Sequence, residues 1–360
     1  MDYKKIVEDD SEIRFYRHLH KKILSYLANK QHSTFWEIIR EVGGSDRRVL
    51  RLLNQMQLAK EIRLENRRIF SLSKKTGNGF INFSEIRKFM SKFYKEKPNP
   101  TFLYDQRPVT LDTTVNRAEY ILRRGDLIGK RIAVIGDDDL TSLAIGLIRL
   151  AKEVVVFDID DRLVRFINQI AKREELNITA YSCDFTSAIP KKFSRKFDVF
   201  LTDPTPNPES FSLFISVGLN LLKKGKRSAG YVSFFPSHQD ISIDFQKILT
   251  NKGVIITDMI HGYTEYDFIK ETYKPIDIEL LKKFDSKSKK LSFTENLTRF
   301  ETTEETIKEK DRINKKTKNR ILGKATRRVL RHIEKDPAYI KGESNFVLSL
   351  AEKLRRGLNE

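Results

Sequence analysis

The sequence predicts a doubly wound α/β fold of the Rossmann type, because one stretch combines two buried strands, a tight loop and a helix. That stretch is residues 130–161, KRIAVIGDDDLTSLAIGLIRLAKEVVVFDIDD. Two short apolar runs, each typical of a buried strand, flank a turn at Gly136 and an apolar-periodic segment typical of a helix. Strand, loop, helix and strand form the first unit of a doubly wound sheet, and ligands bind beyond the carboxyl ends of such strands.

Further apolar runs predict the rest of the sheet. They are ITAYS (178–182), FDVFLTDP (197–204), RSAGYVSFF (227–235), GVIITDMIHGY (253–263) and LSFTENLTRFET (291–302). Apolar periodicity predicts helices at 83–94, 111–124 and 162–175. We expect Asp160 and Asp161 to cap the last of these helices.

The loop after the first strand is unusually acidic, with the consecutive aspartates Asp137, Asp138 and Asp139. Dinucleotide and methyl-donor loops at this place normally offer glycines, whose N–H groups can approach a phosphate or carboxylate. Three carboxylates instead repel an anion, favour a cation and raise one another's pKa, which suits proton transfer. The structural alternative is that one aspartate caps the helix starting near Leu140 while the others face water.

A second acidic feature, Asp203-Pro204, ends the fourth predicted strand, and further acids occur in DIDDR after the second strand and in TEY at 264–266. Together with the Gly-Asp-Asp-Asp loop, these motifs resemble the branched-chain polyamine synthases, the N(4)-bis(aminopropyl)spermidine synthase family of thermophilic archaea and bacteria. The resemblance covers residues 11–302. It implies an aminopropyltransferase that moves the aminopropyl group of decarboxylated S-adenosylmethionine to a secondary amine of a linear polyamine such as spermidine, giving branched polyamines. It also implies that this donor is a co-substrate, with no permanently bound cofactor and no metal.

The resemblance and the residue types assign catalytic roles to four acids, Asp137, Asp138, Asp139 and Asp203. One carboxylate of the acidic loop would act as the base, with the choice among the three left open, and the others would hold flanking ammonium groups. Glu265 would pair with an ammonium of the polyamine, and Tyr263 and Tyr266 would add cation–π contacts. The alternative for this segment is a surface loop with aromatic packing.

The nucleoside of the donor is expected at the ends of the first three strands. Asp158 ends the second strand, where Rossmann folds bind the ribose hydroxyls. Asp184 follows the third strand, where an acid in methyltransferase-like folds accepts from the adenine amino group; otherwise Asp184 is a turn residue. Gly136 forms the loop turn. Gln106, with Tyr104 and Asp105, resembles a family segment near the nucleoside pocket, or else belongs to a simple entry strand and cap.

The Asp-Pro loop departs from the motif that it resembles. In the Asp-Pro-Pro-aromatic motif of aminopropyl and amino-methyl transferases, the aspartate and a rigid loop hold the acceptor nitrogen. Here Thr205 stands where proline is expected and Pro206 where the aromatic residue is expected. The prolines keep the loop stiff, but the stacking aromatic is absent unless Phe211 from the following helix replaces it.

Residues 1–75 predict a winged helix-turn-helix domain. Three amphipathic helices, at 11–28, 35–43 and 46–61, precede two strand-like runs in IRLENRRIFSLS. Thr34 or Ser33 is expected to cap the second helix, and Ser45 the third. The exposed basic residues would be Arg47, Arg48 and Arg51 on the recognition helix and Arg67 and Arg68 on the wing. They would contact phosphates and a groove, or be solvated on a domain reused for dimer or domain contacts.

Prolines and a loss of periodicity mark 76–105 as a linker. The catalytic domain is then expected at 106–302, followed at 303–360 by a basic tail with two helix-like stretches. The net charge of +19 is concentrated in the flanks, with +10 over 1–97, +2 over 98–302 and +7 over 303–360. A polycationic substrate is compatible with this distribution, because flank charges more than about 8 Å away are largely screened at physiological salt.

The composition leaves several partners open and favours one compartment. Nucleic acid contact through the basic N-terminal domain and tail remains open, as does a homodimer. The single cysteine, Cys183, excludes a disulfide framework. No run of eighteen apolar residues and no signal peptide is present, so the sequence predicts a cytoplasmic protein without a membrane segment.

Two other functions fit parts of the sequence. A methyltransferase acting on nucleic acid would use the basic flanks to hold its substrate, but the carboxylate of the methyl donor would lie beside three aspartates. A DNA-binding regulator would combine the winged helix with a Rossmann domain that senses a polyamine or nucleoside. The set of acids favours the enzyme over both.

Overall fold

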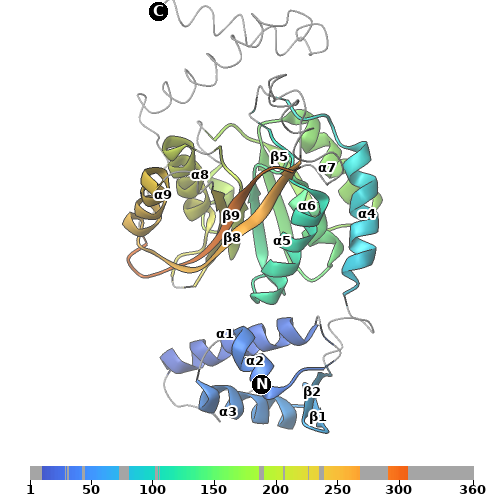
Figure 1. Ribbon diagram of the computed structural model, residues 1–360, viewed down its shortest axis with the longest axis vertical. Helices are drawn as coiled ribbons and strands as arrows, with labels where there is room; N and C mark the ends of the chain where they lie inside the picture. Colours follow the sequence, from blue (N-terminus) through green and yellow to red (C-terminus); the bar gives the residue numbers. More distant parts are fainter. Residues whose placement is uncertain are drawn as a thin grey trace, which may run out of the picture.

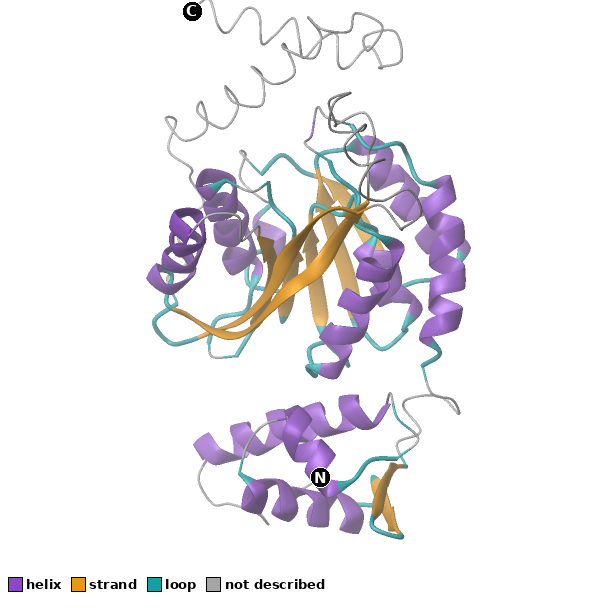
Figure 2. Cartoon of the chain, in the orientation of Figure 1, coloured by secondary structure: helices purple, strands orange, loops and turns teal. Residues whose placement is uncertain are grey.

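The computed structural model describes residues 10–28, 30, 32–42, 45–72, 81–101, 104, 106–185, 190–205, 207–225, 227–234, 239–267 and 291–306. Figure 1 shows a small N-terminal unit, in blue, beside a larger unit built on a twisted sheet. Figure 2 shows that helices flank the sheet of the larger unit on both sides.

The N-terminal unit contains α1 (Asp10–Ala28), α2 (Phe35–Val42), α3 (Asp46–Leu58) and the antiparallel hairpin β1 (Ile62–Glu65) and β2 (Arg68–Ser71). The start of α2 is a capping box: Glu37 N–H donates to the Thr34 hydroxyl (3.3 Å) and Thr34 N–H to the Glu37 carboxylate (2.8 Å). Ser45 occupies the N-cap position of α3, but its side chain makes no capping hydrogen bond, so that expectation was wrong. No helix in the described ranges has the length and apolar character needed to cross a membrane.

The larger unit alternates helices and strands. Its elements are α4 (Phe83–Glu96), α5 (Leu111–Arg123), β3 (Arg131–Ile135), α6 (Thr141–Leu147), β4 (Glu153–Asp158), α7 (Asp161–Arg173), β5 (Ile178–Ser182), η4 (Lys191–Phe193), β6 (Val199–Thr202), α8 (Pro208–Leu221), β7 (Ala229–Phe234), α9 (Gln239–Asn251), β8 (Val254–Asp267) and β9 (Leu291–Thr302). Asp160 caps α7 by accepting from Arg162 N–H (2.9 Å), as expected.

The sheet has the order β5-β4-β3-β6-β7-β9-β8. The strands from β5 to β7 pair in parallel, whereas β9 runs antiparallel to both β7 and β8. The order reverses between β4 and β6 on either side of β3, which makes the loop after β3 the switch point where ligands bind. This mostly parallel sheet confirms the Rossmann-like, methyltransferase-like α/β fold predicted from the sequence.

Alternate residues of each central strand enter two different cores. In β3, Ile132 and Val134 belong to the core formed with α4 to α7, and Ala133 and Ile135 to the core formed with α8 and α9. Such double burial explains why these strands are continuous apolar runs with no polar alternation. The polar chemistry is therefore left to the strand ends and loops.

Helix α4 corrects the expected linker at 76–105. Ile86, Met90 and Phe93 are buried in the same core as β3 and β4, and α4 packs against α5 and α6. The helix was predicted, but its amphipathic face is used by the sheet unit, so this segment is more than a connection. The helix-like stretches expected within 307–360 lie outside the described residues.

Candidate active site

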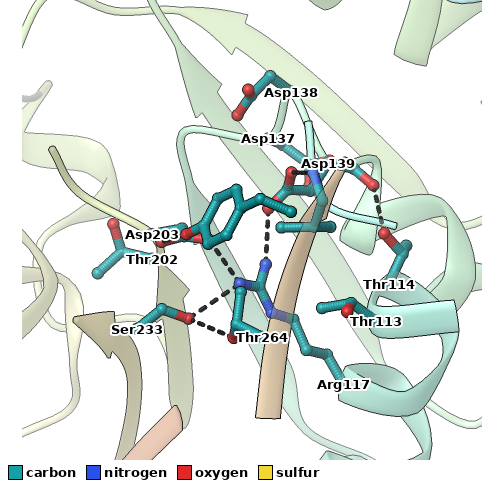
Figure 3. Close-up of polar contacts among 12 residues, drawn as sticks. Thr113, Thr114, Arg117, Asp137, Asp138, Asp139, Thr202, Asp203, Ser233 and Thr264 are labelled. Atoms are coloured by element: carbon teal, nitrogen blue, oxygen red, sulfur yellow. Dashed lines mark hydrogen bonds and ion pairs between the residues drawn. The ribbon is translucent and has the colours of Figure 1, made fainter. Parts of the chain in front are cut away.

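Elements that are distant in sequence converge on one buried arginine, Arg117 of α5 (Figure 3). Its side chain is 1% exposed and forms ion pairs with Asp139 (2.6 Å), from the loop after β3, and with Asp203 (2.5 Å), from the loop after β6. The guanidinium also donates to the hydroxyls of Ser233 on β7 (2.9 Å) and Thr264 on β8 (3.2 Å). The two acidic loops predicted from the sequence are thus brought together by a residue that the sequence analysis missed.

The guanidinium neutralises part of the acidic cluster. Burial opposes its charge, but the carboxylates of Asp203 and Asp139 outweigh burial and hold the pKa of Arg117 well above its usual value. A planar fork can serve two carboxylates at once, which a lysine ammonium cannot do in the same geometry. Removing such a partner would leave two buried anions uncompensated.

Asp137 serves the start of α6. It is 1% exposed, and Ser142 N–H lies 3.3 Å from each of its carboxylate oxygens. Burial raises its pKa to about 8. The aspartate at the helix start is therefore Asp137, the farthest of the three in sequence, because Leu140 turns the chain through a left-handed conformation (φ 57°) before the helix begins.

Asp139 is fixed by contacts on both carboxylate oxygens. One oxygen binds Arg117, and the other accepts from the N–H of Val109 (3.1 Å). Its main-chain carbonyl accepts from the hydroxyls of Tyr94 (3.1 Å) and Thr114 (2.9 Å). These contacts engage both carboxylate oxygens and the main-chain carbonyl of Asp139.

Asp138 differs from its two neighbours. Its residue is half-buried, and in Figure 3 its carboxylate points away from Arg117 with no marked contact. Among the described residues no hydrogen bond or ion pair engages this carboxylate, although its main-chain carbonyl accepts from Lys97 Nζ (3.0 Å). Burial, followed by the charge of Asp139, raises its pKa well above the usual range. A raised pKa makes this carboxylate a stronger base than an ordinary aspartate.

Tyr266 links Asp203 to a further acid, Glu295. The tyrosine hydroxyl lies 2.8 Å from Asp203 Oδ1 and 3.0 Å from Glu295 Oε2. Glu295, on β9, is 2% exposed, and burial followed by the charge of Asp203 raises its pKa to about 9. Glu295 pairs with Thr264 in the register of β8 and β9. Because the Thr264 hydroxyl accepts from Arg117, this pairing brings Glu295 beside the Arg117 cluster. A carboxylate in the middle of a predicted strand was the only sequence signal for it.

Glu265 and Tyr263 do not join the cluster around Arg117. Glu265 lies between Thr264 and Tyr266, whose side chains both reach the cluster, so strand alternation turns its carboxylate to the opposite face. Its main chain pairs with the start of α5, where Thr110 N–H donates to its carbonyl (2.8 Å). The Tyr263 hydroxyl donates to the carbonyl of Asn116 on α5 (2.7 Å).

The residues predicted to bind the nucleoside lie along the ends of β3, β4 and β5. Asp158 is 5% exposed and accepts main-chain N–H groups from Asp137 and Asp160, each at 2.8 Å. Burial raises its pKa to about 6. Gly136 adopts φ 72°, which favours glycine in the turn. Asp184 is exposed, two residues beyond the end of β5.

Gln106 is held beside this row of residues. Its amide donates to Asp160 Oδ2 (3.1 Å) and its carbonyl accepts from Thr101 N–H (2.8 Å). Asp105 lies outside the described residues. The loop after β6 offers no replacement aromatic in Phe211, whose ring is 1% exposed and packs 4.5 Å from the Phe245 ring in the core.

A comparison with models of protein families shows which family the chain belongs to. A family model described as the branched-chain polyamine synthase A C-terminal domain matches residues 85–323. The chain belongs to this family. The match begins within α4, which agrees with the packing of that helix in the sheet unit.

Individual members of the family are similar over part of the chain. N(4)-bis(aminopropyl)spermidine synthase of Methanocaldococcus jannaschii is 39% identical over 196 residues, 53% of this chain and 55% of the relative. The synthase of Thermococcus kodakarensis is 38% identical over 201 residues, 53% of this chain and 56% of the relative. The chain thus spans about half the length of the curated relatives that it matches.

A solved structure is similar over more of the chain. It is the branched-chain polyamine synthase from Thermus thermophilus in complex with N4-aminopropylspermidine and 5′-methylthioadenosine. Its sequence is 25% identical, its TM-score is 0.57, and the match covers 87% of this chain and 96% of that one.

Proposed function

We propose that the protein is an aminopropyltransferase that moves the aminopropyl group of decarboxylated S-adenosylmethionine to a secondary amine of a linear polyamine such as spermidine. The product would be a branched polyamine. The observation that carries the proposal is the acid-rich site of a member of this family, in which Arg117 pairs with Asp139 and Asp203. The nearby acids Asp137, Asp138 and Glu295 have raised pKa values. The names of the curated relatives and the ligands of the Thermus thermophilus structure support it.

Charge explains why such a site would select the decarboxylated donor. This donor carries a sulfonium and a terminal ammonium but no carboxylate. The ordinary methyl donor has a carboxylate that the acidic loop would repel. Asp158 would accept from the two ribose hydroxyls, and Asp184 from the adenine amino group. Gly136 and Gln106 would complete the nucleoside side of the site.

The transfer is a displacement at carbon that needs a neutral acceptor nitrogen. The acceptor ammonium first loses a proton to a base, and its lone pair then forms the new C–N bond as the C–S bond breaks. Methylthioadenosine leaves with the sulfur electron pair, and the product nitrogen remains an ammonium. We assign the base to Asp138, because the Asp137 carboxylate accepts a hydrogen bond from Ser142 at the start of α6 and the Asp139 carboxylate forms an ion pair with Arg117.

The remaining acids would hold the charges that the substrates bring. Asp203, oriented by Arg117 and Tyr266, would face the acceptor amine. Glu265 and Tyr263 would contact the polyamine farther from the reacting nitrogen, since neither reaches the Arg117 cluster. No step requires a metal or a resident cofactor.

We further propose that the N-terminal unit is a winged helix and that the enzyme works in the cytoplasm. Three helices followed by a short hairpin support the winged-helix interpretation. Arg47, Arg48 and Arg51 are exposed on α3, and Arg67 and Arg68 on the hairpin, which supports contact with nucleic acid or with a second subunit. The basic residues of 303–360 would provide a further contact with nucleic acid.

The direct test is incubation with spermidine and either the decarboxylated or the ordinary donor, with products measured by mass. We expect one or two aminopropyl additions with the first donor and none with the second. Calorimetry should also show tighter binding of 5′-methylthioadenosine than of S-adenosylmethionine. Methylation of nucleic acid, or equal binding of the two nucleosides, would contradict the proposal.

A further inference from the structure

One hydroxyl group in the site lies between two carboxyl groups. Tyr266 Oη is 2.8 Å from Asp203 Oδ1 and 3.0 Å from Glu295 Oε2, both within the range of a hydrogen bond. A phenol has one proton to donate. Shared between two acceptors, that proton makes two weaker bonds. Two full hydrogen bonds require one carboxyl group to carry a proton and donate it to the phenol oxygen, so that the three groups hold one proton more than two ionised acids would.

The extra proton belongs on Glu295. Burial raises the pKa of Asp203, but the Arg117 guanidinium, paired with the other oxygen of this carboxylate, opposes that rise and favours the ionised form. Glu295 is 2% exposed and, within the described part of the chain, has Tyr266 as its hydrogen-bond partner and no ion pair. Burial and the nearby charge of Asp203 raise the pKa of Glu295 to about 9. Burial also raises the pKa of Tyr266 well above its usual value, so the phenol keeps its own proton.

We propose that Glu295 is a positioning residue that acts as a neutral carboxylic acid: it donates to Tyr266, which in turn donates to Asp203. This chain of hydrogen bonds fixes the Asp203 carboxylate in its ionised form, with Arg117 on its second oxygen. A buried network of this kind orients its last member only while every bond is made. The catalytic meaning of the chain rests on the proposed function, in which Asp203 faces the acceptor amine.

The charged groups around Glu295 define how pH acts on this chain. Besides burial, the charges of Asp203 and Asp139, in the loops after β6 and β3, raise the pKa of Glu295. The hydrogen bond to Tyr266 on β8 and the charge of Arg117 on α5 lower it. Below the pKa of Glu295 the chain of hydrogen bonds is complete. When Glu295 ionises, two carboxylates compete for one phenol proton, and one of the two contacts is lost. Asp203 then loses its fixed orientation, and transfer should decline on the alkaline side with an apparent pKa that belongs to the coupled groups.

Three variants separate a neutral acid from an ionised one. In Glu295→Gln the amide N–H donates to Tyr266 as the carboxylic acid would, but it cannot ionise. Glu295→Leu and Tyr266→Phe break the chain. We expect these two to lose about tenfold to a hundredfold in kcat/KM, the usual worth of a hydrogen bond to a charged group. Glu295→Gln should recover most of the turnover that Glu295→Leu loses, and its pH profile should lack the alkaline decline. Asp244→Asn, an exposed carboxylate on α9, should keep the wild-type profile.

A measurement without turnover distinguishes failure of this inference from failure of the proposed function. Infrared difference spectra of the free protein, wild type against Glu295→Gln, should show a protonated carboxyl band at pH 7 that titrates near pH 9. If the band is present but no polyamine is aminopropylated, the proposed function fails while the protonation of Glu295 stands. If the band is absent and Glu295→Gln retains the alkaline decline, Glu295 is ionised and the inference is overturned.

Discussion

Asp137, Asp138 and Asp139 are identical side chains in three different environments. Asp137 accepts from Ser142 at the start of α6, and Asp139 contacts Arg117 and Val109. The Asp138 carboxylate has no hydrogen bond or ion pair within the part of the chain that the structure describes. Environment decides which acid can exchange a proton, because burial and hydrogen bonding act on the pKa in opposite directions. In the proposed function, Asp137 would shape the loop, Asp139 would bind Arg117 and Asp138 would accept the proton.

Replacing Asp138 by asparagine tests this division. We expect Asp138→Asn to fold normally and to lose about 10²–10⁴ in kcat, the usual worth of a positioned general base, with little change in the KM for the amine. Asp203→Asn should instead mainly raise the KM for the amine, because it removes a charge that acts before and during transfer. The measurements are steady-state kinetics with spermidine and far-ultraviolet circular dichroism. Wild-type turnover in Asp138→Asn would move the base elsewhere.

Arg117 is predicted to be essential for stability. Arg117→Met leaves Asp139 and Asp203 buried without a counter-charge, which should lower the free energy of unfolding by about 3–5 kcal/mol. Lowering the pH should shrink this loss, because the uncompensated carboxylates can then take up protons. Urea unfolding at pH 5 and pH 8 measures both effects.

Arg123 on the same helix provides the control. Its side chain is 41% exposed and pairs with Glu41 of the N-terminal unit (2.8 Å). Arg123→Met should cost less than about 1 kcal/mol, as exposed ion pairs do. Arg117→Lys should recover only part of the loss, because one ammonium cannot serve both carboxylates in the fork geometry. Equal costs for the two methionine variants would remove Arg117 from its central role.

The sequence revealed the acids of the site better than their partners. The aspartates could be found because each follows a buried strand, and strand ends meet at one edge of a parallel sheet. The role of Arg117 could not be predicted, because in the helix LDTTVNRAEYILR its arginine is indistinguishable from an exposed polar residue of an amphipathic helix. Glu295 was hidden because its position depends on the pairing of β9 with β8. Both residues acquire their roles from tertiary contacts.

At the level of elements, the predicted strands and helices are largely confirmed, and the differences have local causes. Strand β9 spans 291–302 as predicted, whereas β8 continues beyond 263 to Asp267 because it stays paired with β9 across register shifts. The placement of β9 between β7 and β8 could not be read from periodicity. Apolar runs identify strands, but their order depends on crossovers that leave no local pattern.

Close packing between strands leaves no room for a side chain at Gly230. Gly230 of β7 lies under the rings of Phe300 and Phe200, and a Cβ atom there would overlap the Phe300 ring. We expect Gly230→Ala to cost about 1–3 kcal/mol, as overpacking of a core does. The double variant with Phe300→Leu should cost less than the sum of the two single changes, measured by urea unfolding in a double-mutant cycle. Strict additivity would show that the backbone adjusts without the ring.

At the level of the whole molecule, α1 and α2 of the N-terminal unit contact α5 of the sheet unit. The Glu41–Arg123 ion pair joins α2 to α5, and Lys22 of α1 lies against Gly125 at the end of α5. By contrast, α4 belongs to the sheet unit through Ile86, Met90 and Phe93, each buried. In the sequence, α4 lies between the two units. Its buried apolar side chains, however, pack in the core of the sheet unit.

Truncation on either side of α4 tests this assignment. A chain beginning at residue 81 keeps the helix, and we expect it to be soluble and to unfold cooperatively in urea. A chain beginning at residue 98 loses the burial of Ile86, Met90 and Phe93, worth roughly 5–8 kcal/mol. That loss is comparable with the entire stability of a typical domain, about 5–15 kcal/mol, so the shorter chain should fail to fold. Met90→Asp in the longer chain should reproduce the failure, because it buries an unpaired charge in the same core. A stable, cooperatively unfolding chain from residue 98 would return α4 to the role of a linker.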